Sequence, residues 1–206
     1  MSLLATCTFF SACVSTPKPF VSHQQSGSWE AKAQAKDLTN DKSYNLSLDM
    51  MAVTPDLFRM DVSGTLGISL ATMVINKNQV QLALYREKKY YEGALSDHAL
   101  RSMFKMNLNP RLLMNVCTDS PVSDSGWGCK IGVDGMVDFC VRKSDGFKIQ
   151  WSERDGEKKR VTLTDKGFEL QIVFKSFTEG DPTNVQSGKS PFQFETPKDF
   201  TKYQIP

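Results

Sequence analysis

The sequence predicts a mainly β protein: a single curled antiparallel sheet of about 10–11 strands, with a lid of short α-helices over a hydrophobic cavity. Apolar and polar residues alternate with a period of two over most of the chain from residue 28 onward. Asp-Gly pairs separate many of these segments, and such pairs are typical of tight hairpin turns. Between about residues 96 and 117 the period becomes helical. Because helices cannot extend a sheet, we expect these to cover it.

Length and composition fit one folded core. The chain has 206 residues, and 25 Lys and Arg against 23 Asp and Glu give a formal net charge of +2. A protein whose main partner is a nucleic acid usually carries a clustered basic excess, so we expect no nucleic-acid partner. No apolar run approaches the roughly 20 residues that a membrane-spanning helix needs. A polytopic membrane protein is therefore excluded.

The N-terminus has features of an exported lipoprotein. Residues 1–12 carry no charge, and Phe10-Ser11-Ala12-Cys13 resembles a bacterial lipobox, in which the cysteine after two small residues is acylated. We interpret residues 1–13 as a signal and lipobox remnant, with Cys13 as the lipidation site. Residues 14–27 are rich in Ser, Pro and Gln, which is typical of a flexible tether. The alternative is a disordered N-terminus with incidental cysteines.

The first strands are predicted by alternation. In residues 29–36 a tryptophan and three alanines alternate with polar residues, and residues 44–50 and 58–63 repeat the pattern with larger apolar side chains. Residues 67–75 are apolar on both faces, as expected of a central strand that is covered on both sides. Residues 80–84 alternate again after an Asn-Lys-Asn turn. These segments predict an antiparallel meander.

The alternation resumes after the helical region. Residues 137–142, 147–152, 161–163 and 168–175 place apolar side chains at every second position. The Asp residues between these segments mostly precede Gly, which supplies the backbone conformation of a hairpin turn. We therefore interpret these Asp residues as turn formers and not as catalytic groups.

Two short helices are predicted for the lid. Ser96 is suited to cap a first helix over residues 97–104, where apolar residues recur at helical spacing. Pro110 is suited to the first position of a second helix, which carries apolar residues as far as Val116. Both helices are amphipathic, so each would turn its apolar face toward the sheet.

The inner face of such a sheet either encloses a cavity or packs completely. Ala31, Ala33 and Ala35 leave room on the inward face, and several inward methionines would give a pliable lining. A thin helical roof need not fill this space, which favours a cavity for an apolar ligand. A fully packed core agrees equally well with the pattern, and the residues alone leave both interpretations open.

The chain also resembles a known family. The segments 55–60 (PDLFRM) and 63–70 (SGTLGISL), the pair Tyr90-Tyr91 and the lid resemble LolB of the LolA/LolB lipoprotein-localisation family. Residues 192–200 (FQFETPKDF) are similar to the closing strand that LolB shares with LolA. We identify residues 28–206 as a LolA/LolB-like open-barrel domain with a helical lid at about 96–117.

This resemblance implies an open, or half, β-barrel whose hydrophobic cavity takes lipoprotein acyl chains. It implies a lipid-anchored receptor on the periplasmic face of the outer membrane of a Gram-negative bacterium, which inserts lipoproteins into that membrane. The expected partners are those acyl chains, a LolA-like periplasmic donor and the outer-membrane lipid surface. No cofactor is implied, and we expect a monomer.

The resemblance also assigns site residues. Leu66 corresponds to an exposed leucine of LolB, on the loop between its third and fourth strands, that is used in membrane insertion. The alternative is that Leu66 packs under a neighbouring loop. Arg59 lies in the strand where LolA carries an arginine that engages the lid, but we assign Arg59 no role. The candidate cavity lining comprises Trp29, Leu46, Leu48, Phe58, Met60, Leu82, Leu84, Leu100, Phe104, Leu112 and Leu113.

Other reactive or charged residues indicate little chemistry. Cys117, Cys129 and Cys140 are foreign to the family pattern, and two of them could pair in an oxidising periplasm without the sequence selecting which. The chain has only two histidines and no nucleophile beside a base, so we expect neither a metal site nor an enzyme. The clusters 88–89 and 158–160 are interpreted as solvated strand ends, with weak attraction to anionic headgroups as the alternative.

Two functions of different classes follow. The first is the lipoprotein carrier described above. The second is a structural or other amphiphile-binding envelope lipoprotein of the same fold, without transfer activity. The size of the space beneath the lid separates the carrier from the structural lipoprotein, because a structural protein requires no room for hydrocarbon tails.

Overall fold

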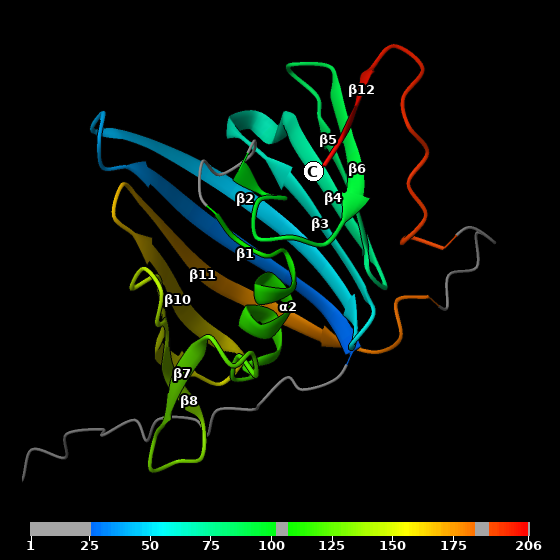
Figure 1. Ribbon diagram of the computed structural model, residues 1–206. Coiled ribbons are helices and arrows are strands. Elements are labelled where there is room, and N and C mark those ends of the chain that lie inside the picture. Colours follow the sequence, from blue (N-terminus) through cyan, green and yellow to red (C-terminus); the bar gives the residue numbers. More distant parts are fainter. Residues whose placement is uncertain (1–25, 102–106, 184–189, 206) are drawn as a thin grey trace, which may run out of the picture.

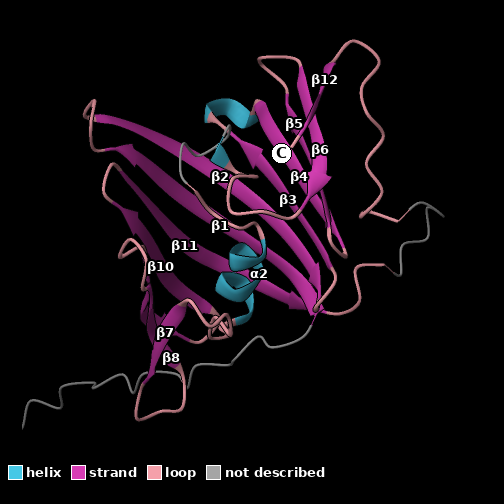
Figure 2. Ribbon diagram, viewed as in Figure 1, coloured by secondary structure: helices cyan, strands magenta, loops and turns pink. Residues whose placement is uncertain are grey.

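The computed structural model of the chain describes residues 26–101, 107–183 and 190–205. These residues form one open, curled sheet of twelve strands in the order β12-β6-β5-β4-β3-β2-β1-β11-β10-β9-β8-β7 (Figures 1 and 2). The predicted single curled sheet is therefore confirmed, with twelve strands. The strands are β1 (Ser26–Asp37), β2 (Lys42–Val53), β3 (Leu57–Ser63), β4 (Ser69–Asn76), β5 (Gln79–Leu84), β6 (Lys89–Ala94), β7 (Trp127–Ile131), β8 (Val137–Arg142), β9 (Lys148–Asp155), β10 (Lys158–Asp165), β11 (Phe168–Glu179) and β12 (Thr201–Gln204).

The first strand joins the two halves of the sheet. β1 pairs antiparallel with β2 on one side and with β11 on the other, so the halves that the helical region separates in sequence become continuous in space. Trp29, Ala31, Ala33 and Ala35 are all buried on the inner face, as the alternation predicts. The concave face of the sheet is the core of the molecule.

The C-terminal segment corrects one prediction. Residues 192–200 do not form the closing strand; the strand is β12, which follows them and pairs parallel with β6. The preceding residues instead pack against the outer face, where Phe192 is buried and the ring of Phe194 stacks on that of Tyr90. Arg59 Nη1 donates a hydrogen bond to the carbonyl oxygen of Pro191 at 2.9 Å. Arg59 therefore points away from the helix and holds this segment.

That outer cover accounts for a feature of β4. Thr72 and Val74 on its outer side are buried, as are Met73 and Ile75 on its inner side. The sequence predicts a strand covered on both faces over residues 67–75, and the structure shows this for residues 71–75, whereas residues 67–69 are exposed. Core side chains cover the inner face of β4. The C-terminal segment packs on the outer face of the neighbouring strands.

The helical region differs from the prediction. In the described residues it contains one helix, α2 (Arg111–Thr118), preceded by Pro110 as expected. Residues 97–100 form turns, and residues 102–106, which include Phe104, lie outside the described residues. A lid of several helices is therefore not shown. The short 3-10 helix η1 (Thr65–Gly67) lies in the β3–β4 loop.

The three cysteines among the described residues form one disulfide and leave one free thiol. Cys129 of β7 and Cys140 of β8 form a disulfide, and Cys117 on α2 is free and buried. The disulfide staples the hairpin at the edge of the sheet opposite β12. Among the described residues, no helix is both long and apolar enough to cross a membrane. Cys13 and most of the tether lie outside the described residues.

Candidate hydrophobic binding site

The concave face has two ends with different contents. Figure 1 shows α2 in front of β1 and β11, toward the lower end of the sheet. There Leu112, Leu113 and Val116 of the helix are buried in the core. Cys117 also faces the sheet, because its Sγ lies 3.6 Å from Met50 Sδ on β2. This end of the face is filled by the helix, as a packed core would require.

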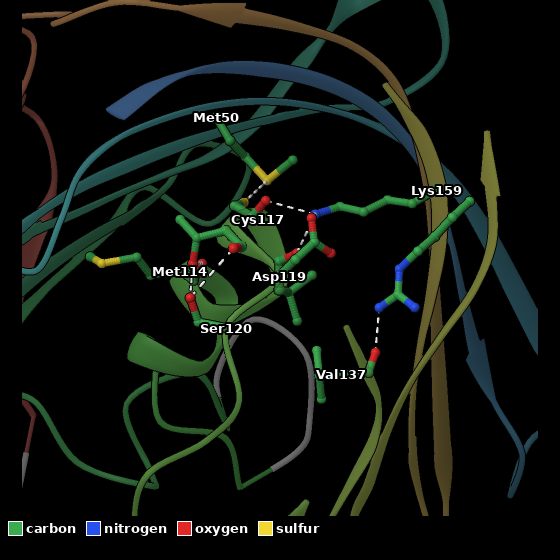
Figure 3. Close-up of polar contacts among 10 residues, drawn as sticks. Met50, Met114, Cys117, Asp119, Ser120, Val137 and Lys159 are labelled. Atoms are coloured by element: carbon green, nitrogen blue, oxygen red, sulfur yellow. Dashed lines mark hydrogen bonds and ion pairs between the residues drawn. The ribbon is translucent and has the colours of Figure 1, made fainter. Parts of the chain in front are cut away.

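A buried ion pair holds the helix in place (Figure 3). The ammonium group of Lys159 on β10 donates to Asp119 Oδ2 at 2.8 Å, and neither side chain is exposed to solvent. It also donates to the carbonyl oxygens of Val116 (2.8 Å) and Cys117 (2.6 Å), which are in the last turn of α2. An ammonium has three donors, and all three are used. Lys159 therefore caps the C-terminus of the helix from the sheet.

The protonation of this pair follows from its geometry. Burial lowers the pKa of Lys159 and raises the pKa of Asp119, because each charged form loses its hydration. Each partner's charge opposes that shift in the other. We assign the charged pair, because three acceptors surround the ammonium and the C-terminal end of a helix favours a cation. Burial raises the pKa of the Cys117 thiol to about 12, so this cysteine is no nucleophile at neutral pH.

Residues 158–160 were interpreted as a solvated strand end, and for Lys159 this is wrong. The sequence nevertheless contained a signal for the buried pair. Lys159 has the same strand parity as Val161 and Leu163, which face the core, so its side chain also points inward. Asp119 adopts a left-handed backbone conformation (φ 53°) at the end of α2, which Asp tolerates better than most residues. Both residues are therefore placed by local geometry, and the fold brings them together.

The other end of the concave face contains an open cavity of about 570 Å³. Its wall comes mainly from β1 to β6 and the start of β11. Apolar side chains dominate it, and a few polar residues stand among them. The residues that line it are Ala35, Asp37, Tyr44, Leu46, Val62, Leu70, Ala71, Leu84, Arg86, Glu87, Lys89, Tyr91 and Phe168. This volume lies within the usual range for small-molecule sites, about 300–1,000 Å³.

The cavity lies at one rim of the sheet. Its lining residues fall where β1, β3 and β5 end and where β2, β4, β6 and β11 begin. The turns between these strands therefore surround it, and they lie along the upper rim of the sheet in Figure 1. Along β1 the cavity-lining Ala35 is six residues from the core residue Trp29, a separation of about 20 Å in an extended strand.

Leu66 is the most conspicuous residue of this rim. It lies in the β3–β4 loop and is 94 % exposed, which excludes packing under a neighbouring loop. Its backbone is left-handed (φ 62°, ψ 21°), a conformation that costs a non-glycine residue about 1–2 kcal/mol. An exposed leucine in this conformation contributes nothing to the stability of the fold that would offset that cost. Its side chain is therefore available for contact with a surface outside the folded domain.

Further apolar side chains are exposed at the same end. Leu38 in the β1–β2 turn, Tyr44 at the start of β2 and Ile68 after η1 are each more than half exposed. Tyr44 also lines the cavity. The rim (Leu38, Tyr44, Leu66 and Ile68) is thus an apolar border on one side of the cavity. Scattered exposed apolar residues are ordinary, but a group beside a cavity is typical of an interaction site.

The structure divides the predicted lining residues between the two ends. Leu46 and Leu84 line the cavity. The others among the described residues are buried in the core and not on the cavity wall, because the helix and the segment leading to it occupy that part of the face: Trp29, Leu48, Phe58, Met60, Leu82, Leu100, Leu112 and Leu113. Phe104 lies outside the described residues. The prediction missed Tyr91 and Phe168, although both lie on the inward side of alternating segments.

No group of three or more potential metal ligands occurs in the described part of the chain. Comparisons with known proteins give neither a matching family model nor a matching curated protein. Two similar solved structures are an uncharacterized conserved protein from Thermus thermophilus (15 % identity, TM-score 0.40, covering 86 % of this chain and 90 % of that chain) and a LolA superfamily protein from Nitrosomonas europaea (8 % identity, TM-score 0.42, covering 77 % and 87 %).

Proposed function

We propose that this protein binds the acyl chains of lipoproteins in the cavity and inserts these lipoproteins into the outer membrane. It would do so as a lipid-anchored receptor on the periplasmic face, acylated at Cys13 and supplied by a LolA-like donor. The observation that carries the proposal is the unfilled apolar end of the concave face, about 570 Å³ in volume. A coarser part of it, binding of a hydrocarbon tail, needs only that cavity.

The cavity wall suits a tail better than a polar ligand. Leu46, Val62, Leu70, Leu84 and Phe168 supply branched and aromatic surface. Each methylene that passes from water into such surroundings is stabilised by about 0.8 kcal/mol. A small difference in depth between this cavity and that of a donor would therefore set the direction of transfer without covalent chemistry.

The apolar rim supports the release step. A leucine that is fully exposed on the β3–β4 loop gains about 2 kcal/mol when it enters an apolar phase. Because the loop adjoins the cavity, its contact with the lipid surface would bring the cavity mouth to the membrane. The tail would then pass from protein to bilayer over a short path.

Transfer is the decisive measurement. A lipoprotein with a labelled acyl chain is bound to a LolA-like soluble donor and mixed with liposomes that hold this protein in its lipidated form. We expect label to appear in the liposomes only when the protein is present. The Cys13→Ser variant lacks the acylated cysteine. Adding it in soluble form to liposomes without protein tests whether the lipid anchor is needed. If label stays on the donor in every case, the carrier function is wrong.

Substitution of Leu66 by glutamate is expected to slow this transfer at least tenfold, because a carboxylate resists entry into the bilayer and the apolar contact of about 2 kcal/mol is lost. Val133→Glu is the matched control, since Val133 is also a fully exposed apolar residue but lies in the β7–β8 turn at the other end of the sheet. A normal transfer rate for the folded Leu66 variant would show that Leu66 has no role in insertion.

A second candidate is a non-transporting envelope module, and the helix-filled end of the concave face favours it. Leu113, Val116 and Cys117 pack there as in an ordinary core. Mass spectrometry of the protein purified from cells separates the two candidates. A carrier brings acyl lipid with it, and a module whose face is closed brings none.

A further inference from the structure

The cavity mouth carries basic side chains on one wall. Arg86, in the turn between β5 and β6, and Lys89, the first residue of β6, both line the cavity. They lie at the same end of the strands as the apolar rim, but nearer the β12 edge of the sheet, four to five strands away from β1. Two cations at the edge of an apolar cavity are positioned to meet the polar end of a ligand whose tail lies inside.

These two cations differ from their neighbour in the same turn. Lys88 pairs with Asp199 at 2.7 Å and does not line the cavity. In the part of the chain that the structure describes, no carboxylate lies within ion-pair distance of Arg86 or Lys89. The ammonium of Lys89 lies instead 5.8 Å from the centre of the Tyr203 ring. No described residue therefore provides either side chain with a direct anionic partner.

The acidic residues of the cavity do not supply that partner. Asp37 Oδ1 accepts hydrogen bonds from the backbone amides of Thr39 and Asn40, both at 3.1 Å, and Oδ2 accepts one from Asn40 Nδ2 at 2.9 Å. This carboxylate therefore builds the β1–β2 turn. Glu87 is exposed and reduces the net charge of the basic wall without pairing with either cation.

We infer that the amphiphile bound in this cavity has an anionic headgroup, which Arg86 and Lys89 bind at the mouth while the tail occupies the apolar interior. A charge-assisted hydrogen bond from a guanidinium or an ammonium is the strong form of such a contact. The inference rests on the coarser part of the proposed function, the binding of a hydrocarbon tail, and adds the chemistry of the head. It applies to a carboxylate and to a phosphate alike, because both are oxyanions.

The experiment compares lipids that share a tail and differ in the head. Binding of palmitoyl lysophosphatidylglycerol and palmitoyl lysophosphatidylcholine is measured by calorimetry below their micelle concentrations. We expect the wild-type protein to bind the anionic lipid about tenfold more tightly, a modest preference because both cations are partly exposed. Palmitate in the same assay distinguishes a carboxylate ligand from a phosphate ligand. The preference should shrink as salt is added.

The double variant Arg86→Gln, Lys89→Gln is expected to bind both lysophospholipids with the same affinity, close to the wild-type affinity for the zwitterionic one. Lys88→Gln removes one positive charge, as each single variant does, from the same turn but not from the cavity wall, so it should keep the preference. The single variants repeat the test if the double variant does not fold.

The outcomes separate this inference from the proposed function. Equal binding of the two lysophospholipids by the wild-type protein overturns the anionic headgroup and leaves acyl binding intact. A lost preference in Lys88→Gln, or loss of both lipids by a folded double variant, also overturns the role of Arg86 and Lys89. If the wild-type protein binds no lipid at all, the proposed function itself fails.

Discussion

Replacement of Lys159 by methionine is expected to lower the free energy of unfolding by about 3–5 kcal/mol, the usual cost when one partner of a buried ion pair is removed. Methionine fills similar space, so the loss is chiefly electrostatic. The carboxylate of Asp119 stays buried without its cation, and the carbonyls of Val116 and Cys117 lose their donor. Equilibrium unfolding in urea measures the change, with the slope of the transition as a check on two-state behaviour.

Two further variants isolate the cause. Lys158→Met makes the same chemical change at the adjacent exposed position, and we expect it to alter stability by no more than about 0.5 kcal/mol. The double variant Lys159→Met, Asp119→Asn also removes the unpaired negative charge at position 119. Asn tolerates the left-handed backbone conformation of this position, as Asp does. This pair of changes should regain part of the lost stability. A stable single variant would mean that the ion pair does not hold α2.

Leucine at both Ala35 and Ala71 is expected to weaken palmitate binding at least tenfold. Both alanines line the cavity from the sheet, and the added isobutyl groups occupy space that the tail requires. Each methylene displaced from the cavity costs about 0.8 kcal/mol, so displacement of two already exceeds the 1.4 kcal/mol of a tenfold change. Calorimetric titration of the wild-type protein and the double variant with palmitate provides the measurement.

Ala94→Leu serves as the control for this experiment. It adds the same group at an exposed strand position that is no part of the cavity, so palmitate binding should stay as in the wild type. Unfolding curves show whether the double variant keeps its fold. Undiminished palmitate binding by a folded double variant would place the tail outside the cavity and remove the main support for a carrier.

Much of the fold was predictable because the strands obey a period of two. The alternation in β1 and β2 identified the inward faces correctly, and the largely apolar β4 indicated a strand covered on both sides. Pro110 marked the start of the helix. These signals are local, and the structure retains them because one face of nearly every strand is buried.

The parts that escaped prediction depend on contacts between distant segments. β12 is four residues long and exposed, so its sequence carries no inward face; it forms because it lies beside β6. Residues 192–200 contain alternating aromatic residues, yet Phe192 and Phe194 pack on the outer face of the sheet as a loop. No period in the sequence indicates which face of the sheet such a segment covers.

The candidate site was predictable in kind but not in position. Inward alanines and leucines indicated an apolar interior, but not which part of it the helix would fill. The placement of α2 decides this, and the helix is anchored at its end by Lys159, a residue that the sequence pattern was taken to place in solvent. Leu66 was singled out through a family resemblance, and its exposure in the structure agrees with that choice.

The arrangement of the concave face has a consequence for how such a chain changes over time. The ion pair that secures α2 joins Lys159 of β10 to Asp119 at the end of the helix, and neither of these elements contributes a residue to the cavity wall. A substitution in the lining therefore leaves the anchor of the fold untouched, and new ligand preferences are accessible through single steps that keep the protein folded. Redesign for another amphiphile should accordingly begin at the turns of the rim and leave the helix contacts as they are.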